Sequence, residues 1–218
     1  MKRIGPIKLT AIIMAGGKGS RLGGKFGEKP LVKIGGIEML KRVDTALKGS
    51  KYISRILVAC SPHAPRTLNE AKRWGMRVVV APGKGYVEDM KYVMRRLRLQ
   101  HAALVVNSDL PLLTSELVDR AVESFLRAKK PALEVVVLSQ TMRELGFEPS
   151  YPSPSGLSPA GLNILDAKTT KAGDEILEQE ILIIKEVSEL ININTPKDIQ
   201  KAERLLANRL TCSTGEDA

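Results

Sequence analysis

The chain has 218 residues with a formal net charge of +10, and 43% of its residues are apolar. This length and balance predict one globular domain with a core large enough to need no disulfide staples. No apolar run is long enough to cross a bilayer, and the two cysteines and two histidines lack the spacing of a disulfide or metal framework. We expect one domain over residues 1–210, a flexible tail over 211–218, and a cytoplasmic location without membrane insertion.

Apolar, β-branched runs alternate with amphipathic stretches as far as residue 138. The expected strands in this part are residues 9–14, 53–60, 77–81, 103–107 and 133–138, and the expected helices are residues 38–47, 65–74, 87–97 and 115–128. This rhythm predicts an α/β three-layer sandwich, in which helices cover both faces of a mostly parallel central sheet.

The rhythm breaks after residue 138. A loop rich in Pro, Ser and Gly occupies residues 147–160, and a loop of this length in a compact domain is typical of a functional or disordered segment. Short strands are expected at residues 161–165, 181–184 and 191–194, and a helix over residues 196–208 closes the domain.

The positive net charge permits anionic partners, either nucleic acid or small polyphosphates. Only 4% of the residues are aromatic, and the basic residues are scattered along the expected helices. Surfaces that stack single-stranded bases need aromatic side chains among the cations. We therefore expect no nucleic-acid partner, and we interpret the charge as solvated helix faces with a few cations reserved for a phosphate site.

A glycine-rich turn directly follows the first expected strand. Glycines let backbone N–H groups approach a polyphosphate with no Cβ in the way, and Lys18 and Arg21 add charge-assisted contacts to phosphate oxygens. The candidate nucleotide-binding residues of this turn are Ala15, Gly16, Gly17, Lys18, Gly19, Ser20 and Arg21.

Two other phosphate motifs fail at this turn. The dinucleotide fingerprint needs a third glycine where Leu22 stands, and it needs an acid after the second strand, which is absent. A Walker loop needs Ser or Thr after Lys25, but Phe26 stands there, so the magnesium-binding hydroxyl is missing.

Asp109 follows the buried strand 103–107, and the carboxyl ends of strands face the ligand crevice in an open parallel sheet. Asp109 is therefore placed to hold Mg²⁺ between phosphate oxygens; the alternative is that Asp109 caps the next helix.

Asn192 and Asn194 lie two residues apart in an expected strand and so project to one side. Either amide oxygen can complete the metal site or an acceptor-phosphate site, and we favour Asn194 as the metal ligand. Thr195 is expected to cap the closing helix.

A second glycine turn, with Gly83, Lys84 and Gly85, follows the third expected strand and is placed to close on the nucleotide. Ser61, at the tip of the second strand, is a further candidate for base contact. Asp89 lies in the first turn of the next helix, where the helix dipole alone favours an acid, so a structural role and a binding role both stay open.

The order Ala-Gly-Gly-x-Gly-x-Arg-Leu-Gly from Ala15, followed by Glu28-Lys29-Pro30-Leu31, resembles the signature loop of nucleotidyltransferases with a Rossmann-like fold. The resemblance implies that this loop wraps a triphosphate and that Lys29 reaches the α-phosphate region. The segments from Gly83 to Asp89 and from Pro159 to Asn163 narrow the resemblance to archaeal-type adenosylcobinamide-phosphate guanylyltransferases.

This closer resemblance implies GTP as donor, adenosylcobinamide phosphate as acceptor, and Mg²⁺ as cofactor. It implies catalytic roles for Arg21, Lys29 and Asp109, and an acceptor side formed by Gly161 and Asn163, to which Asn192 is added. A molybdopterin or sugar-phosphate nucleotidyltransferase is the alternative within the enzyme class. A basic nucleic-acid-binding module is the alternative from another class. The sequence leaves the oligomeric state open, and a homodimer is compatible with it.

Overall fold

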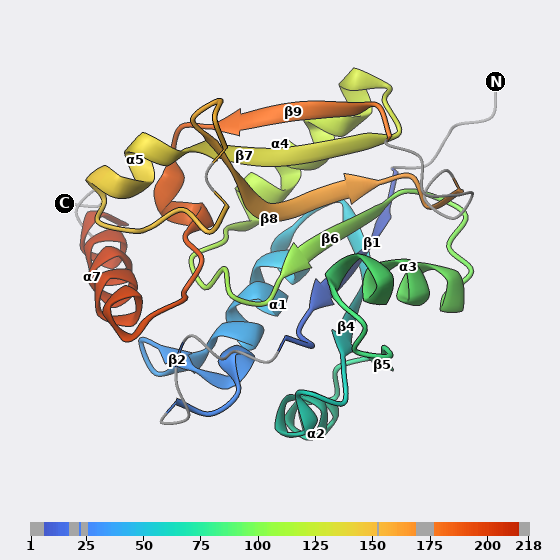
Figure 1. The fold of residues 1–218 in the computed structure, drawn as a ribbon, viewed down its shortest axis with the longest axis horizontal. Coiled ribbons are helices and arrows are strands. Elements are labelled where there is room, and N and C mark those ends of the chain that lie inside the picture. Colours follow the sequence, from blue (N-terminus) through green and yellow to red (C-terminus); the bar gives the residue numbers. More distant parts are fainter. Residues whose placement is uncertain (1–6, 18–21, 23–25, 152, 169–176, 214–218) are drawn as a thin grey trace.

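The computed structural model describes residues 7–17, 22, 26–151, 153–168 and 177–213. Its centre is one seven-stranded sheet with the strand order β5-β4-β1-β6-β8-β7-β9 (Figure 1). These strands are β1 (Leu9–Met14), β4 (Ile53–Cys60), β5 (Val78–Val80), β6 (Ala103–Asn107), β7 (Ala132–Leu138), β8 (Leu157–Leu165) and β9 (Gln179–Ile184). A separate hairpin pairs β2 (Lys33–Ile34) with β3 (Ile37–Glu38). The helices are η3 (Lys29–Leu31), α1 (Met39–Gly49), α2 (Pro65–Arg73), α3 (Tyr86–Arg96), α4 (Ser115–Ala128), α5 (Ser139–Glu144), η4 (Val187–Leu190) and α7 (Pro196–Ser213).

The strand directions confirm the predicted α/β fold with a mostly parallel sheet. β5, β4, β1 and β6 run parallel, β8 runs antiparallel to its neighbours β6 and β7, and β9 runs parallel to β7. The chain moves outward from β1 to β4 and β5 and then returns to β6 on the other side of β1. The carboxyl ends of β1 and β6 thus flank a topological switch point, the place where open α/β sheets bind ligands.

Helices cover both faces of the sheet, as predicted, because its central strands are apolar on both sides. In β1, Ala11 and Ile13 face a larger core with α1 and α4, whereas Ile12 faces a smaller core with α3. Figure 1 shows α1 and α4 behind the sheet and α3 in front of it. Burial on both faces fixes the register of these strands and holds their carboxyl ends in place.

The last third of the chain differs from the prediction. β8 begins at Leu157, so the end of the expected loop 147–160 is strand. Pro159 fits in this strand because the ladder between β8 and β6 covers only residues 162–165, which leaves no β6 partner for Pro159. The short helix α5 was not predicted. Residues 191–194 form no strand; they run without a ladder between η4 and α7.

The closing helix is longer than predicted. α7 ends at Ser213, so the first three residues of the expected tail are helical, and residues 214–218 lie outside the described part of the chain. The other expected elements agree with the structure to within two residues at each end, apart from the early start of β8. Among the described residues, none of the helices combines the length and the apolar character that crossing a membrane requires.

Candidate functional site

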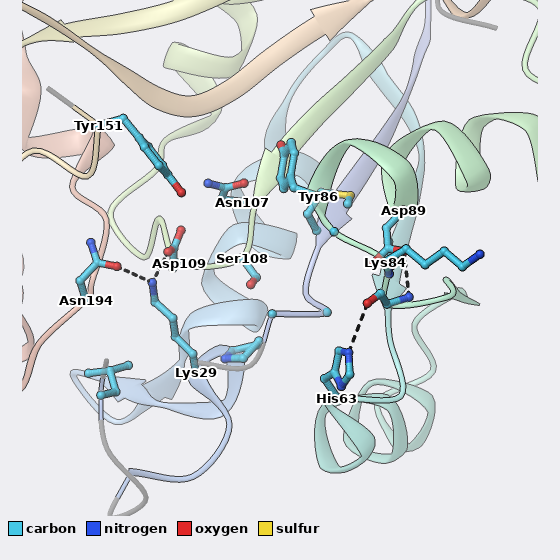
Figure 2. Close-up of a pocket in the computed structure, with 18 residues that line it drawn as sticks. Lys29, His63, Lys84, Tyr86, Asp89, Asn107, Ser108, Asp109, Tyr151 and Asn194 are labelled. Atoms are coloured by element: carbon cyan, nitrogen blue, oxygen red, sulfur yellow. Dashed lines mark hydrogen bonds and ion pairs between the residues drawn. The ribbon is translucent and has the colours of Figure 1, made fainter. Parts of the chain in front are cut away.

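A cleft of about 590 Å³ opens at the switch point, beyond the carboxyl ends of β1 and β6 (Figure 2). The residues predicted from the sequence that line it are Gly16, Gly17, Lys29, Gly83, Lys84, Gly85, Asp109 and Asn194. Its other lining residues are Met14, Leu22, Pro30, Ala59, His63, Tyr86, Asp89, Asn107, Ser108 and Tyr151. The fold therefore gathers residues from seven separate parts of the chain around one space.

The glycine turn after β1 is supported from within the core by Ser61. The Ser61 hydroxyl donates to the carbonyl oxygen of Gly16 at 2.6 Å and accepts from the N–H of His63 at 3.1 Å. Residue 16 has no room for a side chain, because a Cβ would lie 2.9 Å from the Ser61 Cβ. Ala15 and Ser61 are buried, and Gly16 and Gly17 form the surface of the cleft. The remaining predicted residues of this turn, Lys18, Gly19, Ser20 and Arg21, lie outside the described residues.

The turn before α3 is held closed by Asp89. Its Oδ1 accepts hydrogen bonds from the N–H groups of Gly83 at 2.9 Å and of Lys84 at 3.2 Å. Gly83 and Gly85 have φ angles of +78° and +122°, a region that favours glycine. The ring of His63 lies against the same turn, with Nε2 3.2 Å from the carbonyl oxygen of Gly83. Of the two roles left open for Asp89, the structure shows the structural one.

Asp109, at the end of β6, forms an ion pair with Lys29. The Lys29 ammonium also donates to Oδ1 of Asn194 at 2.9 Å, and Nδ2 of the buried Asn192 donates to Oδ1 of Asp109 at 2.9 Å. The side chains of Lys29 and Asp109 are 17% and 14% exposed, so their attraction is screened less than that of a surface pair. Figure 2 shows Lys29 pointing to the space between Asp109 and Asn194.

The position of Lys29 follows from a helix cap made by its neighbour Glu28. The Glu28 carboxylate accepts hydrogen bonds from the N–H groups of Arg66 at 2.8 Å and Thr67 at 2.6 Å, in the first turn of α2. These N–H groups have no partner within the helix, and a negative charge is favoured at a helix N-terminus. Pro30, on the other side of Lys29, is buried. The lysine backbone is thus held on both sides, and its side chain is directed into the cleft.

The side chains of Asn192 and Asn194 lie beside Asp109 and Lys29, although the strand expected there does not form. The two isoleucines of this segment are buried, so the alternation predicted from the sequence holds without a ladder. Asp198 accepts hydrogen bonds from the N–H groups of Asn194 at 2.9 Å and Thr195 at 2.7 Å, and Thr195 Oγ1 accepts from the N–H of Asp198 at 3.3 Å. This is a capping box, and the prediction that Thr195 caps the closing helix is confirmed.

Neutral polar groups form the wall of the cleft next to β8. The hydroxyl of Tyr86, the first residue of α3, shares a side-chain hydrogen bond with Asn163 of β8. Although 42% of Tyr86 is exposed, desolvation of its hydroxyl and, next, the charge of Asp109 raise the pKa of Tyr86 to about 12, so this phenol stays protonated at neutral pH. Gly161 has a φ of +79° and lies so close to Asn107 that a Cβ would overlap the Asn107 amide. The two residues predicted on the acceptor side, Gly161 and Asn163, do not line the cleft themselves, but each lies against a residue that does, Asn107 and Tyr86 respectively.

Sequence reasoning did not assign His63, Tyr86, Asn107, Ser108 or Tyr151 to the site. Asn107 and Ser108 directly precede the strand-end acid, so the rule that selected Asp109 applies to them as well. Tyr86 stands in one of the segments that carried the family resemblance. Tyr151 belongs to the Pro-, Ser- and Gly-rich loop, and no local pattern distinguishes it from its neighbours.

The group around Asp109 fits a magnesium ion that takes most of its ligands from phosphates. Oδ2 of Asp109 and Oδ1 of Asn194 converge on one cation in this structure, the ammonium of Lys29. Within the described part of the chain, no three His, Cys, Asp or Glu side chains are grouped to hold a metal ion. Mg²⁺ needs no such group, because one or two carboxylates, substrate phosphates and water suffice. Asp109 with Asn194 supplies oxygen ligands of this kind.

Comparison with known proteins gives a family match and similar relatives, two of which are described below. The model of the MobA-like NTP transferase domain matches residues 11–159. The chain is similar to the adenosylcobinamide-phosphate guanylyltransferase of Methanocaldococcus jannaschii, with 36% identity over 209 residues that cover 91% of this chain and 97% of that protein. It is also similar to the 2-C-methyl-D-erythritol 4-phosphate cytidylyltransferase of Frankia casuarinae, with 30% identity over 233 residues that cover 97% of this chain and 85% of that protein.

Among solved structures, the fold is similar to that of a CMP:2-keto-3-deoxy-manno-octonic acid synthetase complexed with CTP. The TM-score is 0.70 with 14% identity, and the match covers 93% of this chain and 99% of that chain. At this identity the likeness concerns the fold alone. The segment that matches the family model contains the glycine turn, Lys29, the turn before α3 and Asp109. The matched segment therefore contributes most of the residues that line the cleft.

Proposed function

We propose that this chain, which belongs to the family of MobA-like NTP transferase domains, transfers GMP from GTP to the phosphate of adenosylcobinamide phosphate. The products are adenosylcobinamide-GDP and pyrophosphate. The observation that carries the proposal is the 36% identity with the guanylyltransferase of M. jannaschii over nearly the whole length of both chains. The sequence prediction of a nucleotidyltransferase is confirmed at the level of the family.

The reaction is an in-line displacement at the α-phosphorus of GTP. An oxygen of the acceptor phosphate forms the new P–O bond, the bond from the α-phosphorus to the oxygen that bridges to the β-phosphorus breaks, and pyrophosphate leaves with the electron pair. A phosphate dianion is already a nucleophile, so the reaction needs no general base. Catalysis then consists of positioning and charge neutralisation.

Different residues of the cleft position the substrates and neutralise their charge. The backbone N–H groups of the glycine turn bind the triphosphate, together with Lys18 and Arg21. The Lys29 ammonium, at the end of a flexible four-carbon stem, turns from Asp109 to the α-phosphate when GTP binds. Asp109 and Asn194 would hold a magnesium ion, which would supply positive charge to the phosphate oxygens.

The two substrates occupy opposite walls of the cleft in this proposal. The guanosine lies against the turn of Gly83 to Gly85, which Asp89 holds closed. The acceptor phosphate approaches from β8, where Tyr86 and Asn163 offer neutral hydrogen-bond donors opposite Lys29. This arrangement leaves the pyrophosphate on the side of the glycine turn, in line with the attacking oxygen.

The test is acceptor-dependent release of pyrophosphate. The purified chain is incubated with adenosylcobinamide phosphate and each of GTP, ATP, CTP and UTP, with and without Mg²⁺. We expect release from GTP that depends on both the acceptor and Mg²⁺. Release from CTP with 2-C-methyl-D-erythritol 4-phosphate, the substrate in the name of the second relative, would instead assign the chain to cytidylyl transfer.

The finer expectations from the sequence remain proposals. They are a cytoplasmic location, a homodimer and the absence of a nucleic-acid partner. Salt-sensitive binding of DNA or RNA without nucleotide turnover would support the nucleic-acid alternative.

A further inference from the structure

The Lys29 ammonium contacts the same two oxygens that fit a divalent cation. Oδ2 of Asp109 forms an ion pair with it, and Oδ1 of Asn194 accepts its hydrogen bond at 2.9 Å. Dashed lines in Figure 2 join Asp109 and Asn194 to the nitrogen of Lys29. The lysine and a metal ion therefore compete for one place in the cleft.

Neighbouring residues hold both oxygens in this arrangement. Nδ2 of Asn192 donates to Oδ1 of Asp109 at 2.9 Å, which turns Oδ2 toward the lysine. Nδ2 of Asn194 donates to the Ser150 hydroxyl at 3.1 Å, so the amide oxygen of Asn194 is turned into the cleft. Lys29 takes no part in these two hydrogen bonds. They can therefore keep the two oxygens in place when its ammonium moves.

The backbone of Lys29 is fixed, but its ammonium is free to move. Glu28 caps α2 on one side, and Pro30 is buried on the other. The ammonium itself stands at the end of a long, flexible stem. In the proposed reaction, the triphosphate of GTP is a second anionic partner within the same cleft. Lys29 thus has two alternative positions, one on Asp109 and one on the nucleotide.

The charge of Lys29 opposes a metal ion as long as the lysine is paired with Asp109. The ion pair carries no net charge, and its two side chains are 17% and 14% exposed. Water screens charges less at this burial than at the surface, so the ammonium both neutralises the carboxylate and repels a divalent cation. A triphosphate reverses this balance, because its oxygens attract the ammonium and the metal ion alike.

We infer that Lys29 keeps the divalent-cation site closed until a nucleoside triphosphate draws its ammonium away from Asp109. This inference rests on the proposed function for the identity of that nucleotide. It couples the two ligands: each raises the affinity of the site for the other, because both need the lysine to leave the carboxylate. Without nucleotide, Asp109 stays paired and the site takes up no metal ion.

The test measures Mn²⁺ binding without nucleotide, since the electron paramagnetic resonance signal of free Mn²⁺ falls when the ion is bound. Wild type is compared with Lys29→Ala and with the control Lys48→Ala. Lys48 pairs with the buried Asp44 at 2.5 Å, outside the cleft, so the control also removes the partner of a carboxylate. We expect the Kd for Mn²⁺ to fall about tenfold or more in Lys29→Ala and to stay unchanged in Lys48→Ala.

Two further measurements identify the place of the ion and the role of the nucleotide. The double variant Lys29→Ala/Asp109→Asn is expected to lose the gain in Mn²⁺ affinity. In thermal unfolding, Mn²⁺ alone is expected to leave the Tm of the wild type unchanged and to raise it when GTP is present. The Tm of Lys29→Ala is expected to rise with Mn²⁺ alone. The same unfolding curves verify that each variant is folded.

The outcomes separate this inference from the proposed function. Equal Mn²⁺ affinity in the wild type and in Lys29→Ala overturns the inference, whether both proteins bind the ion or neither does. An equal gain in Lys48→Ala overturns it as well, because net charge would then be the cause. A gain that survives Asp109→Asn places the ion elsewhere and has the same consequence. The proposed function fails separately, if GTP and the acceptor release no pyrophosphate, since the Mn²⁺ titration needs neither substrate.

Discussion

Nδ2 of Asn192 lies 2.9 Å from Oδ1 of Asp109 and donates a hydrogen bond to it. The backbone reinforces this contact, because the N–H of Ile193 donates to the carbonyl oxygen of Asp109 at 3.2 Å. Together these bonds orient the carboxylate so that Oδ2 faces Lys29 in the cleft. The site therefore holds its acid in one orientation before any substrate binds, which is the preorganisation that electrostatic catalysis needs.

Asp109→Asn keeps the shape of the side chain but removes its charge. We expect the turnover number to fall about a hundredfold or more, because the substitution weakens both the proposed magnesium ligand and the partner of Lys29. Pyrophosphate release measured against Mg²⁺ concentration checks this, with circular dichroism to confirm the fold. Full turnover with unchanged magnesium dependence would exclude Asp109 as a metal ligand.

Lys29→Ala removes the cation that we propose to reach the α-phosphate of GTP. We expect a loss of about a hundredfold in kcat/KM for GTP, typical of one charge that stabilises a transition state. Lys33→Ala is the matched control, since the Lys33 side chain is 62% exposed and lies 3.9 Å from Glu38. Equal losses in the two variants would show that net charge, and not the position of Lys29, matters.

Asp89→Ala removes the acceptor of two backbone hydrogen bonds in the turn of Gly83 and Lys84. The turn then loses its closed form, and we expect a higher Kd for GTP and a loss of stability of about 1 kcal/mol. Glu88→Ala, one residue earlier in the same helix turn, is the control. Isothermal calorimetry and denaturant unfolding measure the two effects, and identical behaviour of both variants would contradict the role of Asp89.

Gly161→Ala tests the contact between β8 and Asn107. The substitution forces a side chain into a positive φ and against the Asn107 amide, whereas Gly156→Ala, with a φ of +76°, has open space around its Cβ. We expect Gly156→Ala to cost about 1 kcal/mol in the free energy of unfolding and Gly161→Ala to cost more. Urea unfolding measures the free energy of unfolding of both variants. The difference between them is the cost of the contact with Asn107, because the backbone strain is common to both. Equal costs would mean that Asn107 moves aside freely.

Cys60 is predicted to be an unreactive thiol in the folded protein. Burial, followed by the charge of Glu28, raises the pKa of Cys60 from 9.0 to about 12. Below pH 9 the thiol is neutral in both the folded and the unfolded chain, but between pH 9 and about 12 only the unfolded chain ionises. This group therefore lowers the free energy of unfolding as the pH rises through that window.

The reagent DTNB checks this prediction at pH 8 in a Cys212→Ser background, where Cys60 is the remaining thiol. We expect reaction in urea and almost none in native buffer. Rapid reaction of the native protein would show that the end of β4 opens to solvent.

The sequence predicted the parallel part of the fold well, for a reason visible in β1 and β6. Both strands are buried on both faces, so they appear as short, continuous apolar runs that end at a glycine turn and at Asp109. Such runs identify strands, and the strand-end rule then identifies the crevice. The residues predicted to bind the nucleotide lie in one kind of feature, the loop after a strand, which local patterns describe.

The region from β8 to α7 was predicted less well, because its structure depends on partners far away in the chain. Residues 191–194 alternate like a strand but find no neighbouring strand, and their polar side chains bond to Asp109 and Lys29. Pro159 marked a loop in the sequence, yet it lies in β8 where the ladder to β6 has already ended. No local pattern contains this information.

The sequence alone determined the fold class and the glycine turn, and it predicted residue types suited to a polyphosphate and magnesium. Only the tertiary structure decided that Lys29 lies between Asp109 and Asn194, that Ser61 and Asp89 support the turns around the cleft, and that Tyr86 meets Asn163. The physical reason is that backbone conformation follows from nearby residues, whereas hydrogen bonds between side chains depend on how distant strands and helices pack.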